Sequence, residues 1–325
     1  MRCVILGAGA LGSILAAHLV RAGHEVVLIA RGARLAQLKN EPLRIGGLVD
    51  LTVRCEARAA AEVPPEADLF VNTVKTADSR TALAALGDFR AELAFSVQNG
   101  VVKEQELIDR FTAPHVLGAM ADFSGDLRAD GSVVFSRNVC LHLGELAGGL
   151  SPRVEALAQC FDAAGIVCRA SAAIRSVIWS KYVGWNALML TAVLTRRTTD
   201  DFLCDPDSAL IVARITREMA ALAAALDIPL EDRSPLPVAR IASGLEGAAL
   251  KAVQETGAAF ARAAPGHRMS SLQDVLRGTP LELEETVGYA LVKARGLGVA
   301  MPTTELCYRL AASVNRSLLA ARAAR

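Results

Sequence analysis

The chain has 325 residues, of which 52% are hydrophobic, and carries 35 basic and 34 acidic residues for a formal net charge of +1. A chain of this length and apolar content can bury more than one core, which predicts two domains. No block of like charges stands out, so the composition argues against a nucleic-acid or anionic-membrane partner and favours small-molecule chemistry.

The seven cysteines are odd in number, widely scattered and never spaced as CxxC. This pattern argues against a disulfide framework and a structural zinc site, so no metal site is expected. The first residues lack the features of a signal peptide, and the apolar run at 182–195 is too short to span a bilayer. We therefore expect a cytoplasmic protein that binds neither membrane nor nucleic acid.

The first part of the chain alternates strand-like and helical patterns. Short apolar runs predict strands at 1–6, 25–31, 68–73 and 93–97, and apolar spacing predicts a helix at 13–22. Such alternation is typical of a parallel sheet.

Later segments change in character. Strand-like pieces at about 115–144, VLGAMADF, SVVFSR and CLHLGE, predict a meander that closes the first domain, and helix dominates from Ser151 onward. We expect an α/β domain over residues 1–170 and an all-helical domain over residues 171–325.

A glycine-rich turn, GAGALG, follows the first strand and opens the first helix. In this context it predicts a Rossmann-type dinucleotide site, in which the first glycine permits a tight turn, the second admits a pyrophosphate and the third allows close helix packing. A glycine-rich turn without a ligand is the alternative. The candidate cofactor-binding residues of this turn are Gly7, Ala8, Gly9, Ala10, Leu11 and Gly12.

The end of the second strand indicates which dinucleotide is bound. An NAD site usually has an acidic residue there to hold the ribose 2′-hydroxyl, whereas this strand ends in Ile29-Ala30-Arg31. An arginine suits a 2′-phosphate, which it can bind through charge-assisted hydrogen bonds, so we expect NADP(H). The alternative is a solvated arginine at the start of the next helix.

Polar residues follow two further strands of the predicted sheet. Lys75 comes after the run at 68–73, and Gln98, Asn99 and Gly100 come after the run at 93–97. Ligands of open α/β sheets bind at these carboxyl ends, so both segments are candidates for the nicotinamide end of the cofactor. Alone, Lys75 would suit a surface lysine and Asn99-Gly100 an ordinary turn.

A mostly apolar helix is expected at 178–194, with Lys181 near its start. A lysine at a helix margin can simply extend to water. Beside a reduced nicotinamide, its ammonium could instead protonate the oxygen that becomes an alkoxide on hydride transfer. A second polar cluster follows at 266–288, where Ser270 and Ser271 suit a helix N-cap with Gln273 completing a capping box, and the acidic residues at 282–285 suit a first helical turn.

Together these motifs resemble the ketopantoate reductases (2-dehydropantoate 2-reductases). The resemblance spans nearly the whole chain and rests on GAGALG, Arg31, Lys75, the QNG at 98–100, Trp179-Ser180-Lys181 and the segment from SSLQD to Gly288. The family reduces ketopantoate with NADPH to pantoate, for pantothenate and coenzyme A synthesis. The resemblance implies Lys181 as general acid, Glu282 as an anchor of the catalytic arrangement, Asn99 and Ser270 as substrate contacts, and Lys75 beside the cofactor.

Two positions differ from the family's pattern. Asparagines commonly stand four and eight residues after its catalytic lysine, where this chain has Trp185 and Met189. Asn186 is the nearest asparagine and a candidate substrate contact, but at helical spacing it points about 140° away from Lys181 unless the helix is distorted. Either Ser270 or Ser271 matches the family's serine.

Three readings of function therefore stay open. The first is ketopantoate reduction, the second is reduction of a more apolar 2-oxo acid in the same way, and the third is a non-catalytic NADP(H)-binding regulator. The apolar C-terminal helices could form a homodimer face or complete the core.

Overall fold

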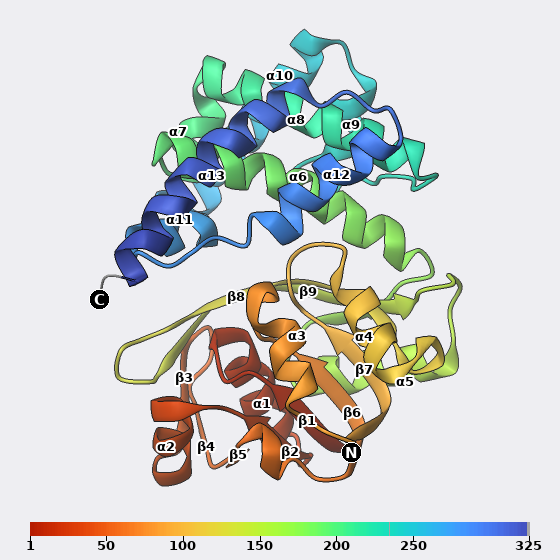
Figure 1. Cartoon of the computed structure of the whole chain (residues 1–325), viewed down its shortest axis with the longest axis vertical. Helices are drawn as coiled ribbons and strands as arrows, with labels where there is room; N and C mark the ends of the chain where they lie inside the picture. The colour runs from red at the N-terminus through yellow and green to blue at the C-terminus, as the bar shows by residue number, and fades with distance from the viewer. Residues whose placement is uncertain (234, 324–325) are drawn as a thin grey trace. The chain divides into compact units, whose positions relative to one another are not determined.

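The structure of the chain is a computed structural model that describes residues 1–233 and 235–323. The chain forms two compact units, Met1–Arg175 and a second unit from Ser176 onward. The first is a parallel-sheet α/β unit and the second is helical, which confirms the expected fold class (Figure 1).

The central sheet of the first unit contains five parallel strands in the order β5-β2-β1-β6-β7. Strand β1 pairs with β2 on one side and with β6 on the other, so the strand order reverses at β1. Ligands of doubly wound sheets bind beside such a reversal, at the carboxyl ends of the strands. The strands are β1 (Arg2–Leu6), β2 (Glu25–Ile29), β5 (Glu56–Arg58), β6 (Glu66–Asn72) and β7 (Arg90–Ser96).

Alternating side chains of β1 face two separate cores. Cys3 and Ile5 pack into a core shared with α1 (Ala10–Arg21) and α5 (Pro152–Ala163). Val4 and Leu6 pack into a core on the opposite face, shared with residues of α3 (Thr76–Ala84) and α4 (Lys103–Phe111). Because the strand is covered on both faces, it reads as a continuous apolar run rather than as an alternating one.

A second sheet of the first unit has the order β10-β9-β3-β4, with β8 paired antiparallel to β9. Its strands are β3 (Leu43–Gly47), β4 (Leu51–Val53), β8 (Leu117–Leu127), β9 (Val133–Glu145) and β10 (Cys168–Ala170), and helix α2 (Gly32–Asn40) precedes β3. The expected three-piece meander is wrong, because SVVFSR and CLHLGE belong to the single strand β9. The pairing with β8 shifts register between Asp122 and Phe123, so Val139 is accommodated as a bulge and no turn is needed.

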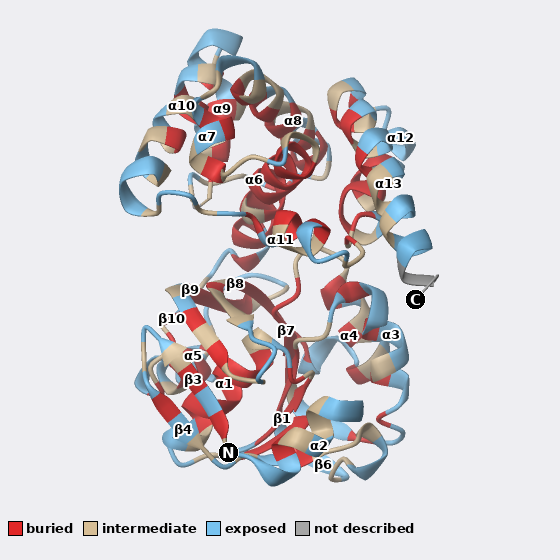
Figure 2. Cartoon of the chain, turned by 90° about the vertical axis from the view of Figure 1, so that its left-hand side faces the viewer, coloured by how far each residue is buried: buried red, intermediate tan, exposed pale blue. Residues whose placement is uncertain are grey.

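The second unit is built around α6 (Ile174–Thr195), whose side chains are buried along most of its length (Figure 2). α6 has the length and apolar composition to cross a membrane, but 89% of its most apolar window is buried inside the protein, as in a core helix. The other helices are α7 (Thr199–Cys204), α8 (Pro206–Ala225), α9 (Val238–Ser243), α10 (Glu246–Ala263), α11 (Ser270–Leu276), α12 (Tyr289–Gly296) and α13 (Pro302–Ala323).

α6 begins four residues earlier than expected, at Ile174 rather than at residue 178. Lys181 therefore lies within the helix and not at its start. The charged Arg175 concealed this first turn in the sequence, because its exposed side chain interrupts the apolar run without interrupting the helix.

Candidate active site

Turns that follow β1, β2, β6 and β7 leave the central sheet at its carboxyl edge and are tied to one another. The Gly7 N–H donates to the Ile29 carbonyl at 3.0 Å, which joins the ends of β1 and β2. Thr73, directly after β6, donates its hydroxyl to the Gly7 carbonyl at 2.8 Å and to the Leu6 carbonyl at 3.0 Å. The glycine-rich turn is therefore held on both sides by its neighbouring strands.

The fold requires glycine at two positions of this turn, and at the third the glycine leaves open space. Gly7 has φ +108°, a conformation that L side chains rarely adopt. A Cβ on Gly12 would lie 2.0 Å from the Gly7 carbonyl oxygen, so only glycine lets α1 start this close to β1. Gly9 is exposed, and a Cβ placed there would meet no atom within 4 Å, which leaves open space above its backbone.

The start of α1 offers hydrogen-bond donors to that space. Gly9 is its N-cap residue and provides no side chain to accept the N–H groups of the first turn, which includes Ala10 and Leu11. Ala8 beside it is buried. An open glycine next to an uncapped helix N-terminus fits the pyrophosphate of a dinucleotide.

Two arginines follow β2, and the structure distinguishes them. Arg34 donates to the Ala8 carbonyl, the Ser13 hydroxyl and the Gly131 carbonyl, so its guanidinium is used within the fold. The Arg31 side chain is 85% exposed and donates to Asp78 of α3 at 2.7 Å. Arg31 is therefore the arginine of this edge that a ligand can approach.

A buried hydrogen-bond network connects the loops after β6 and β7. The Gln98 side-chain oxygen accepts from Ser96 Oγ at 2.8 Å and from Asn72 Nδ2 at 3.4 Å, and its Nε2 donates to the Val74 carbonyl at 2.8 Å. The Gln98 amide is thus engaged within the protein, where it holds the two loops together. These loops carry Lys75, which is exposed at the N-cap of α3, and the half-buried Asn99.

In the second unit, a neighbour of Lys181 connects α6 to the segment that carries Glu282. Lys181 and Glu282 are both half-buried. The Tyr182 hydroxyl donates to the Thr286 carbonyl at 2.6 Å, and Thr286 Oγ1 donates back to the Glu282 carbonyl at 2.5 Å. Burial raises the pKa of Tyr182, so its hydroxyl stays protonated and remains a donor. The backbone position of Glu282 thus depends on the helix that carries Lys181.

The acidic residues at 282–285 were expected to form the first turn of an α-helix, and this expectation is wrong. Glu284 and Glu285 instead begin a π-helical turn, η3 (Glu284–Gly288), which comes before α12. The Glu284 carboxylate accepts from the Tyr308 hydroxyl at 2.8 and 2.7 Å. Single π-helical turns are frequent at functional sites, since they change the direction of side chains at a small cost. Two tyrosines, Tyr182 and Tyr308, therefore hold the same turn.

The two tyrosines give a matched pair of variants. We expect Tyr182→Phe to lower the free energy of unfolding by about 1–3 kcal/mol, because it leaves the buried Thr286 carbonyl without its donor. Tyr308→Phe removes the same atom from a half-buried side chain, where water can replace it, and should cost less than about 1 kcal/mol. Urea denaturation measures both, and equal losses would show that burial of the Tyr182 hydroxyl does not matter.

Of the two candidate serines, Ser271 is the one whose hydroxyl is buried without a hydrogen-bond partner among the described residues. Ser270 is exposed, whereas Ser271 is 5% exposed and its hydroxyl oxygen has no hydrogen-bond partner within the described ranges. The expected capping box is wrong: the N-cap of α11 is Met269, and Gln273 Nε2 donates to the Arg268 carbonyl instead. A buried polar atom without a partner is a signal that only the structure provides, and it makes Ser271 the stronger candidate for a ligand contact.

Asn186 lies in the interior of the second unit, with its Nδ2 donating to the Tyr182 carbonyl at 2.9 Å. Its Oδ1 is buried without a partner among the residues that the structure describes. α6 is α-helical throughout, so no distortion turns Asn186 toward the side of Lys181, and five residues of α-helix separate the two directions by about 140°.

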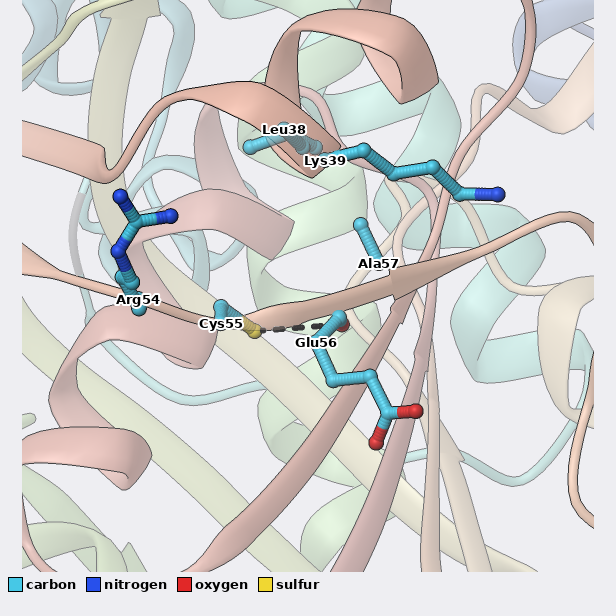
Figure 3. A pocket seen from close by; sticks show the side chains of 6 residues that line it. All are labelled: Leu38, Lys39, Arg54, Cys55, Glu56 and Ala57. Carbon is cyan, nitrogen blue, oxygen red and sulfur yellow. Dashed lines mark hydrogen bonds between the residues drawn. The ribbon is translucent and has the colours of Figure 1, made fainter.

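A hollow of about 310 Å³ lies beside β5, away from these residues (Figure 3). Arg54 and Cys55 in its wall directly precede β5, and Glu56 is the first residue of that strand, so the hollow lies toward the amino end of β5, away from the carboxyl edge where ligands of such sheets bind. Burial raises the pKa of the Cys55 thiol in this wall to about 12, which keeps it protonated and unreactive. Its lining residues are Leu38, Lys39, Arg54, Cys55, Glu56 and Ala57.

No group of three or more His, Cys, Asp or Glu side chains that could hold a metal ion occurs within residues 1–233 and 235–323. The candidate groups described above are the N–H donors at the start of α1, the exposed Arg31 guanidinium, Lys181 and Glu282.

Two family models match the chain. The one described as "Ketopantoate reductase PanE/ApbA" matches residues 3–148, and the one described as "Ketopantoate reductase PanE/ApbA C terminal" matches residues 173–315. Together they include the glycine-rich turn, the segments after β2, β6 and β7, and both candidate catalytic residues of the second unit.

Individual proteins agree with these models. A 2-dehydropantoate 2-reductase from Archaeoglobus fulgidus is 29% identical over 319 residues, which cover 98% of this chain and 99% of that protein. The solved structure of 2-dehydropantoate 2-reductase from Methylococcus capsulatus is 29% identical, with a TM-score of 0.79 over 100% of this chain and 98% of that one. A D-mandelate dehydrogenase, solved with NADH and anilino(oxo)acetate, shares the fold at 20% identity and a TM-score of 0.85, covering 98% of this chain and 99% of that one.

Proposed function

Because the chain belongs to the ketopantoate reductase family, we propose that it reduces 2-dehydropantoate (ketopantoate) to pantoate with NADPH, as a step of pantothenate biosynthesis. Membership of this family supports an NAD(P)H-dependent oxidoreductase that acts on a 2-oxo acid. The observation that carries the proposal is the presence of Lys181 and Glu282 on elements joined through Tyr182 and Thr286.

The preference for NADPH rests on Arg31. Its exposed guanidinium follows β2, where an NAD site would have an acidic residue, and it can form charge-assisted hydrogen bonds to a 2′-phosphate. The uncapped first turn of α1 and the open backbone at Gly9 suit the pyrophosphate. Lys75 and Asn99 follow the two strands on the other side of β1 and are assigned to the nicotinamide half and the substrate.

A nicotinamide cofactor bound at this site would supply a hydride to the 2-oxo carbon. Lys181 donates a proton to the carbonyl oxygen as negative charge develops there, which general acid catalysis requires. Glu282 holds the arrangement around the substrate, and Ser271, with its buried and unpartnered hydroxyl, donates to or accepts from the substrate's polar groups.

A more apolar 2-oxo acid is the second candidate substrate, and Trp185 and Met189 favour it. Both side chains are buried, and they stand four and eight residues after Lys181 on α6. They therefore form an apolar surface on the face of α6 that carries Lys181. A site lined in this way gives up hydrogen bonds to a hydroxyl and gains contact with a larger hydrocarbon group.

Steady-state oxidation of NADPH and NADH with a panel of oxo acids tests the proposal. We expect the highest kcat/KM for NADPH with ketopantoate. A higher value for a bulkier acid such as phenylglyoxylate would replace ketopantoate by the second candidate. Bound NADPH with negligible turnover of every acid would contradict both and support a cofactor-binding regulator.

We also propose a cytoplasmic location and a homodimer. For the dimer, α13 places two leucines one helical turn apart, Leu306 and Leu310, at 61% and 52% exposure. Apolar side chains that repeat at this spacing on a helix suit contact with a second copy. Light scattering of the purified protein measures the oligomeric state.

A further inference from the structure

The group expected to select the cofactor already has an anionic partner in this chain. Arg31 Nη2 lies 2.7 Å from Asp78 Oδ2, with the two side chains 85% and 54% exposed. The residues are 47 positions apart in the sequence and meet because β2 and β6, the strands that precede them, flank β1 on either side. Among the described residues, Asp78 is the one carboxylate within ion-pair distance of Arg31.

Resting on the proposed function, we propose that Asp78 is a specificity-determining residue that weakens this chain's preference for a 2′-phosphate over a 2′-hydroxyl. A guanidinium attracts phosphate through the same N–H donors that bind a carboxylate. The Asp78 carboxylate occupies part of that donor surface, so a 2′-phosphate must displace it or share the guanidinium with it. Displacement breaks the Arg31–Asp78 ion pair and sharing brings two anions together, and each raises the energy of the bound phosphate.

A 2′-hydroxyl experiences no such repulsion. It is neutral, and it can donate a hydrogen bond to a carboxylate, which is how the acidic residue of an NAD site works. The sequence separates these roles, with an arginine at the end of β2 and the acid supplied by the first turn of α3. The pair therefore combines a phosphate-binding group and a hydroxyl-binding group at one place.

The position of Asp78 on its helix makes the carboxylate a stable neighbour of Arg31. It is the third residue of α3, where the helix N-terminus favours a negative charge. Basic residues stand on both sides of Asp78 in the sequence: the exposed Lys75 directly precedes the helix, and the exposed Arg80 follows Asp78 by two residues. Removing the Asp78 charge would leave Arg31, Lys75 and Arg80 without this acidic neighbour.

Binding of two nucleotide probes tests the inference without turnover. Adenosine 2′,5′-bisphosphate carries the 2′-phosphate, and adenosine 5′-monophosphate has a hydroxyl in its place. For Asp78→Asn we expect the Kd of the bisphosphate to fall about three- to tenfold, as for removal of one like charge at an exposed site. The Kd of the monophosphate should stay unchanged, because the asparagine amide oxygen can still accept a hydrogen bond from the 2′-hydroxyl. Isothermal titration calorimetry of the full chain measures both.

Asp88→Asn is the matched control, since Asp88 is exposed, belongs to the same unit and precedes β7 at the opposite edge of the sheet. It removes the same charge and should leave both Kd values unchanged. An unchanged or increased Kd of the bisphosphate in Asp78→Asn would overturn the inference and leave the proposed function intact. Failure of the unaltered protein to bind either probe would overturn both.

Discussion

Replacing Lys181 with alanine is expected to lower kcat for oxo acid reduction by about 10²–10⁴-fold, the usual contribution of a general acid. Lys181 lies in the interior of α6, next to Tyr182, which connects this helix to the Glu282 segment. Without the ammonium, the alkoxide that develops on hydride transfer has no positioned proton donor. The affinity for NADPH should stay within about twofold, because the nucleotide-binding groups of the proposal lie in the first unit.

Single-turnover kinetics and cofactor titration separate these two effects. Lys251→Ala is the matched control, because Lys251 is an exposed lysine of α10 in the same unit. A small alkylamine added to Lys181→Ala should restore part of the rate by supplying the missing proton donor. Turnover equal to that of the unaltered protein would remove Lys181 from the mechanism, whatever the substrate.

Alanine at two glycines of the same turn is expected to have different effects on the free energy of unfolding. Gly12→Ala places a methyl group 2.0 Å from the Gly7 carbonyl oxygen and 2.5 Å from Thr73 Oγ1. Because a backbone atom must move, we expect a loss of about 2–3 kcal/mol in the free energy of unfolding of the first unit. Cofactor affinity should fall with it, since the turn is displaced.

Gly9→Ala, by contrast, should change that free energy by less than about 1 kcal/mol, because its backbone is in a β conformation and its added methyl group meets no atom. The methyl group would still occupy the space proposed for the pyrophosphate, so we expect the Kd of NADPH to rise about tenfold or more. Urea denaturation and NADPH titration of both variants measure the contrast. Unchanged NADPH affinity in Gly9→Ala would exclude the open backbone at Gly9 as the phosphate site.

The regular parts of the fold were predictable because their signals are local. An apolar run followed by GAGALG and a helical pattern can form little other than a strand, a tight turn and a helix, and β1, β2, β6 and β7 of the central sheet appear near the predicted positions. The short strands β3, β4 and β5 were not predicted. Three to five residues with one buried face carry too little pattern to distinguish them from loops.

Errors arose where a contact distant in sequence decides the local structure. The break expected between Arg137 and Cys140 is a bulge in β9, because β8 continues to pair across it. The acidic segment before α12 forms a π-helical turn because two tyrosines, from α6 and α13, hold it there. The residues of β9 give no sign of its pairing with β8, and the residues of the acidic segment give no sign of the two tyrosines.

The sequence by itself determined the strand–turn–helix start of the chain, the dinucleotide motif and the candidate groups Arg31 and Lys181, since each depends on residue type and on spacing along one segment. Glu282 became a candidate only through the resemblance of the whole chain to a family. Tertiary structure alone decided how these groups are used. It brings Asp78 within hydrogen-bond distance of Arg31 and makes the Gln98 amide donate to a backbone carbonyl inside the protein. It also buries the Ser271 hydroxyl without a partner among the described residues and buries Asn186 on a regular α-helix. The physical reason is that a hydrogen bond or an ion pair acts over a few ångströms in space, between residues whose separation along the chain carries no record of it.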